Sequence, residues 1–65
     1  MTKEVISRMP SKVMFVLDSL KADYKSPYMS KDETRARLAG YVLGLRDAGL
    51  ISDRERQILF VYATV

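Results

Sequence analysis

The chain lacks the side chains on which most protein chemistry depends. Its 65 residues include no cysteine, histidine, tryptophan or asparagine. Without cysteine there is no disulfide and no thiolate ligand, and without histidine there is neither an imidazole base nor the commonest zinc ligand. A chain of this length is also too short to enclose a typical ligand pocket of several hundred Å³. We therefore expect a protein that is not an enzyme and that uses no metal, cofactor or disulfide.

The chain also has no block of like charges and no long hydrophobic run. The 11 basic and 8 acidic residues give a net charge of +3, and the two signs are mixed along the whole chain. Because phosphate binding normally needs clustered lysine and arginine, this composition permits a nucleic acid partner without favouring one. The longest uncharged run, from Gln57 to Val65, is much shorter than the ~20 residues that cross a bilayer. We expect a cytoplasmic protein that does not enter the membrane.

Apolar residues, by contrast, make up 48% of the chain, which is enough for a packed core in one domain over residues 1–65. A helix over residues 11–24 is predicted because apolar residues there recur at helical spacing. These residues are Val13, Val16, Leu17, Leu20 and Tyr24. The sequence thus indicates an all-α fold, a small three-helix domain with helices near 11–24, 31–48 and 53–64.

The ends of the second and third helices carry specific signals. Ser30 and Ser52 are each followed three residues later by a glutamate, the pattern of a capping box at a helix N-terminus. Gly49 lies between the two helices, and glycine is the residue best suited to a left-handed helix C-cap. The segment from Leu45 to Glu55 resembles the turn of many small bacterial and phage helical proteins, a likeness that implies a hairpin and no activity. We therefore predict a C-terminal antiparallel helical hairpin.

Two short apolar runs leave an alternative open. Residues 13–17 and 58–62 are rich in amino acids that favour β-strands, and periodicity alone does not assign such short runs. Two strands around one helix would need a second chain to complete a sheet, because an isolated two-stranded sheet is marginal. Helices need only one another, so we expect both runs to be helical.

Two uncharged blocks, residues 38–45 and 58–65, hold candidate interface residues. Small residues recur every four positions around the first block, a spacing that lets helices approach closely. We expect the helix over 11–24 to lie against this stripe, with a contact to another chain as the alternative. In the second block only about half of a helix can face its hairpin partner, so outward apolar residues should mark an interface unless the first helix covers them. The candidates are Gly40, Gly44, Phe60, Val61 and Val65.

Four arginines near helix N-termini form a second set of candidates. Arginine opposes the helix dipole at this position, which suggests a use in binding an anion or nucleic acid. The alternative, which we favour, is pairing with neighbouring acidic residues of the same helices. The four residues are Arg35, Arg37, Arg54 and Arg56.

The leading functional hypothesis is a non-enzymatic protein–protein interaction module that binds a protein partner and self-associates as a homodimer. Its motivation is the small size, the missing catalytic side chains and the surplus of apolar residues. Short chains of this composition are common among phage and plasmid accessory proteins, which suggests a regulator that acts by occluding its partner.

The main alternative is a small DNA-binding regulator. One version resembles the ribbon-helix-helix repressors, with residues 3–9 as a strand, and the other is a helix-turn-helix made by residues 31–48 and 53–64. Against the second version, the last helix is almost entirely apolar after Gln57 and offers few side chains for reading bases. Catalysis by Asp53 and Glu55 is a third option, but residues two apart lie on different faces of a helix.

Overall fold

The computed structural model describes residues 2–65, which form four helices. They are α1 (Thr2–Arg8), α2 (Ser11–Lys25), α3 (Lys31–Asp47) and α4 (Asp53–Thr64). No strand occurs in this part of the chain, so the apolar runs at 13–17 and 58–62 are both helical. The all-α class is confirmed, and the three predicted helices lie within a residue of their expected bounds. None of the helices in residues 2–65 is long and apolar enough to span a membrane.

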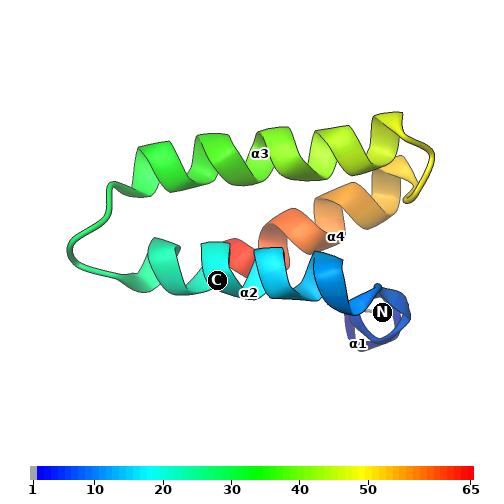
Figure 1. Cartoon of the computed structure of the whole chain (residues 1–65), viewed down its shortest axis with the longest axis horizontal. Helices are drawn as coiled ribbons and strands as arrows, with labels where there is room; N and C mark the ends of the chain where they lie inside the picture. The colour runs from blue at the N-terminus through cyan, green and yellow to red at the C-terminus, as the bar shows by residue number, and fades with distance from the viewer. Residues whose placement is uncertain (1) are drawn as a thin grey trace.

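The helices pack as a small bundle of 32 × 21 × 19 Å. In Figure 1, α2 and α3 run antiparallel, joined by the loop over residues 26–30 on the left. The α4 helix returns from the right-hand end of α3 and crosses behind α2. The α1 helix is seen nearly end-on beside the start of α2, so it lies across the bundle rather than along it.

The prediction of three helices was wrong at the N-terminus, where α1 is a separate helix. Pro10 has a non-helical backbone (φ −58°, ψ 150°) and divides α1 from α2. A helix of seven residues is not stable alone in water, so α1 depends on its contact with α4. Val5 is buried in that contact, and Arg8 Nη2 lies 3.3 Å from Glu55 Oε2. The ribbon-helix-helix reading is also wrong, because residues 3–8 of its supposed strand are helical.

The hairpin between α3 and α4 forms as its local signals predict. Gly49 has φ +77°, and its amide donates to the Arg46 carbonyl at 2.9 Å while the Leu50 amide donates to the Leu45 carbonyl at 3.0 Å. This is the Schellman pattern that ends a helix at a left-handed residue. At the start of α4 the capping box of Ser52 and Glu55 is complete. The hairpin geometry is therefore fixed by local hydrogen bonds at both of its ends.

The core gathers apolar side chains from all four helices and from the turn before α4. Its buried members are Val5, Val13, Leu17, Leu20, Leu38, Val42, Ile51, Leu59 and Ala63. One polar side chain, Thr34, is also buried, and its hydroxyl has no hydrogen-bond partner among residues 2–65. At the edge of the core the Tyr62 hydroxyl donates to Asp18 Oδ1 at 2.6 Å, which ties α4 to α2.

Candidate functional site

The acidic residues of α4 have structural partners. Asp53 Oδ1 accepts from Arg56 at 2.9 Å and from Arg46 at 2.8 Å, and these hydrogen bonds lower the pKa of its carboxyl from 3.8 to about 2. Glu55 accepts from the Ser52 backbone amide at 2.8 Å, which lowers the pKa of the glutamate. Both carboxylates thus stabilise the α3–α4 turn. Residues 2–65 contain no group of three or more acidic side chains placed to hold a metal ion.

The four candidate arginines do not come together in one place. Arg35 and Arg37 lie in the first half of α3, whereas Arg54 and Arg56 begin α4, beside the opposite end of α3 (Figure 1). Arg35 Nη1 lies 3.3 Å from Asp32 and its Nη2 donates to the Tyr24 hydroxyl at 2.8 Å. Arg56 pairs with Asp53 at 2.9 Å. Arg35 and Arg56 therefore pair with acidic residues of their own helices, which is the alternative favoured from the sequence.

The side of α3 that points away from the bundle is exposed and mostly apolar. We call this surface the outer α3 face and define it by its exposed residues Ala36, Arg37, Ala39, Gly40, Leu43, Gly44 and Asp47. Leu43, its one large apolar side chain, is 41% exposed. In Figure 1 no other helix lies on this side of α3.

The expectation that the helix over 11–24 lies against the small-residue stripe was therefore wrong. A methyl group built on Gly40 or Gly44 meets no other atom within 4 Å, so no segment of the described chain covers either residue. The bundle instead buries the opposite side of α3, where Leu38 and Val42 are fully inaccessible. The physical reason is that leucine and valine remove far more apolar surface from water than glycine does.

The α4 candidates divide between core and surface. Phe60 is half-buried and packs against the core, so the expectation that it points outward is not met. Val61 and Val65 are 57% and 76% exposed. Successive residues of a helix differ by about 100° in direction, which is why Phe60 reaches the core edge while its neighbour does not.

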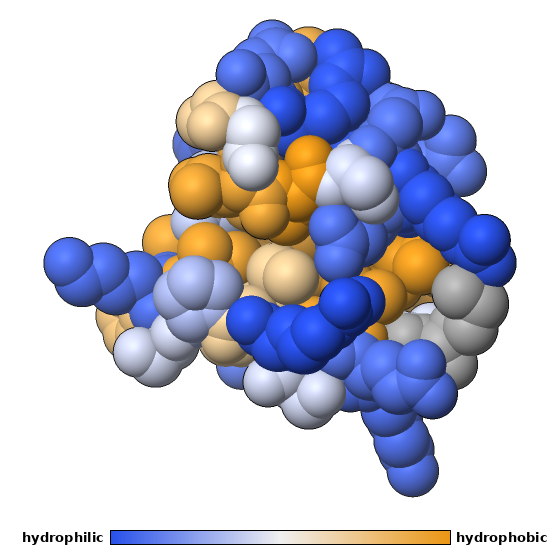
Figure 2. Space-filling view, turned by 90° about the vertical axis from the view of Figure 1, so that its right-hand side faces the viewer, coloured by the Kyte–Doolittle hydropathy of each residue, from blue (hydrophilic) through white to orange (hydrophobic). Residues whose placement is uncertain are grey.

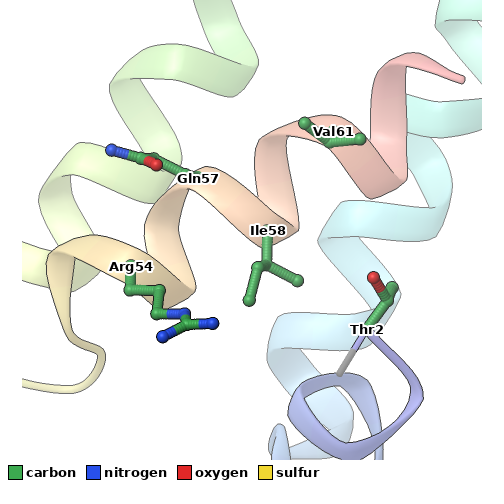
Figure 3. A pocket seen from close by; sticks show the side chains of 5 residues that line it. All are labelled: Thr2, Arg54, Gln57, Ile58 and Val61. Atoms are coloured by element: carbon green, nitrogen blue, oxygen red, sulfur yellow. The ribbon is translucent and has the colours of Figure 1, made fainter.

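A groove between α1 and α4 adjoins Val61. It has a volume of about 330 Å³ and is lined by Thr2, Arg54, Gln57, Ile58 and Val61. Figure 3 shows Ile58 and Arg54 directed toward α1, with Thr2 on the far side of the groove. The groove brings together one candidate arginine and one candidate interface residue, but only two of its lining side chains are large and apolar.

Three further apolar side chains are exposed that the sequence reading did not single out. Leu43 belongs to the outer α3 face, Leu50 in the α3–α4 turn is 67% exposed, and Phe15 on α2 is 75% exposed. Figure 2 views the molecule from the end that carries the α3–α4 turn. Apolar side chains lie at the centre of this view, with hydrophilic side chains around them. A signal for Phe15 was present, because it is out of phase with the buried positions Val13 and Leu17.

Comparison with known proteins gives no relative. No protein-family model matches this chain, and neither a curated protein nor a solved structure is significantly similar to it. A functional proposal therefore depends on the surfaces just described, of which the outer α3 face is the longest continuous one on a single helix.

Proposed function

We propose that this chain is a non-enzymatic protein–protein interaction module that binds its partner through the outer α3 face. The observation that carries the proposal is the composition of this face. A helix on the surface of a soluble bundle normally exposes charged and polar residues, whereas this one exposes alanine, glycine and leucine along its middle. Contiguous apolar surface of this kind marks an interface.

The construction of α3 supports the proposal. Its start is capped by Ser30, which accepts a hydrogen bond from the Glu33 amide at 3.3 Å, and its end by the turn at Gly49. The opposite side is fixed by the fully buried Leu38 and Val42. A partner would therefore meet a rigid surface and would lose little of its binding free energy to ordering it. A small regulator that acts by occlusion would work in this way.

Photo-crosslinking in the cells that make the protein tests this function. A photoreactive residue placed at Leu43, on the outer α3 face, should give covalent protein adducts. The same residue placed at Ser19, an exposed position on α2, is the matched control and should give none. Equal patterns from the two positions, or no adduct from Leu43, would overturn the proposal. Retardation of duplex DNA at low salt would instead favour the helix-turn-helix alternative.

A further inference from the structure

We infer that the partner of the outer α3 face is a second copy of this chain, packed antiparallel along α3. This inference rests on the proposed function and names its occupant. Three features of the face support it, namely the symmetric placement of its small residues, the symmetric placement of two opposite charges, and the open space above its glycines.

Four small residues on and beside the outer α3 face are placed symmetrically along the helix. Gly40 and Gly44 lie two residues before and after Val42. Ala36 and Ala48, the exposed C-cap residue just beyond the face, lie six residues before and after it. In an antiparallel pair related by a two-fold axis at the level of Val42, each glycine therefore comes opposite the other glycine of the partner. The same holds for the two alanines. Helices that meet at small residues approach closely enough for their backbones to touch.

The charges at the edges of the face obey the same symmetry. Arg37 and Asp47 lie five residues before and after Val42, so the arginine of one copy comes opposite the aspartate of the other, twice per dimer. Arg37 takes part in none of the ion pairs found in residues 2–65. Asp47 pairs only with the adjacent Arg46 at 3.1 Å, and its side chain stays 65% exposed. A parallel arrangement would place each charge opposite its own kind.

The size of the outer α3 face determines the affinity that we expect for the dimer. The contact runs over residues 36–48, about 20 Å of helix. Two helices that meet over this length bury less than the 1,200–2,000 Å² typical of stable specific complexes, so we expect a dissociation constant of roughly 10–500 μM.

Sedimentation equilibrium of the full chain, from about 10 μM to about 1 mM, tests the inference. The wild-type chain should pass from monomer to dimer over this range. Arg37→Asp and Asp47→Arg should each weaken the dimer about tenfold or more at low salt, because each places like charges opposite one another. An equimolar mixture of the two variants should form a mixed dimer at wild-type strength, since both of its pairs are again complementary. Lys12→Asp, an equal charge reversal on α2, is the control and should change nothing.

A steric variant gives an independent readout. Gly44→Leu should abolish the dimer while leaving the helix content of the monomer unchanged, because the space above Gly44 is empty in the monomer. The inference is overturned if the wild-type chain stays monomeric to about 1 mM, if the mixed variants fail to associate, or if Gly44→Leu still dimerises. If the chain is monomeric but still gives adducts from Leu43 with another protein, the identification of the partner as a second copy is refuted and the proposed function is not. A monomer without adducts would refute both.

Discussion

The exposed glycines of α3 allow a quantitative prediction about the monomer. Glycine inside a helix is unfavourable relative to alanine because its backbone loses more conformational freedom on folding. Nothing lies within 4 Å of a methyl group built on Gly40 or Gly44, so alanine at either position meets no steric resistance. We therefore expect Gly40→Ala and Gly44→Ala to stabilise the folded chain.

The magnitude follows from helix propensity. Each substitution should add about 0.5–1 kcal/mol to the free energy of unfolding, and the double variant about 1–2 kcal/mol. For a domain of this size, 1 kcal/mol corresponds to a rise of about 4–8 °C in the melting temperature. Thermal and urea unfolding followed by circular dichroism at about 1 μM, where the proposed dimer is largely dissociated, would measure both quantities.

A reverse substitution on the same face is the matched control. Ala36→Gly should lower the free energy of unfolding by about as much as Gly40→Ala raises it, because both exchange the same methyl group at an exposed helical position. If Gly40→Ala or Gly44→Ala instead leaves stability unchanged or reduces it, some part of the chain covers these residues. The outer α3 face would then not be free, and the argument for an interface there would fail.

Three further predictions concern the contacts that hold the helices together. Ser52→Ala should cost about 1 kcal/mol in urea unfolding, because the amide of Glu55 loses its capping acceptor. Asp53→Asn should lower stability at neutral pH, because a folded-state pKa below the ordinary value of 3.8 stabilises the fold above that value. The contribution decreases below pH 3.8 and is lost as the pH falls through about 2, so the urea midpoints of the two proteins should converge across this acid range. Tyr62→Phe should cost about 1 kcal/mol through loss of the hydrogen bond to Asp18, measured by thermal unfolding against Tyr28→Phe, an almost fully exposed control that should be neutral.

The hairpin shows what could be predicted from sequence and why. Both ends of α3 and the start of α4 were predicted to within a residue because the groups that define them are neighbours in the chain. Ser52 and Glu55 satisfy each other's backbone amides, and Gly49 takes the left-handed conformation that glycine adopts readily. Such hydrogen bonds form wherever the local sequence occurs, whatever the rest of the molecule does.

The separate α1 helix shows where local reasoning stops. Seven residues before Pro10 are too few to display a helical period, and the burial of Val5 depends on a core formed with the other helices, of which α4 is the main contact of α1. Residues 2–8 by themselves do not predict that α4 lies beside them. The helix therefore exists through a contact between residues about fifty positions apart, which Arg8 and Glu55 illustrate at 3.3 Å.

The candidate interface divides in the same way. The sequence by itself determined that Gly40, Gly44, Val61 and Val65 belong to apolar stretches with more surface than one helix partner can cover. Only the tertiary structure decided which side of each helix the bundle buries. The bundle buries Leu38 and Val42 of α3 and leaves Gly40 and Gly44 exposed, because burial of large apolar side chains releases more free energy than burial of small ones. Composition thus set how much apolar surface the chain carries, and packing set where that surface is exposed.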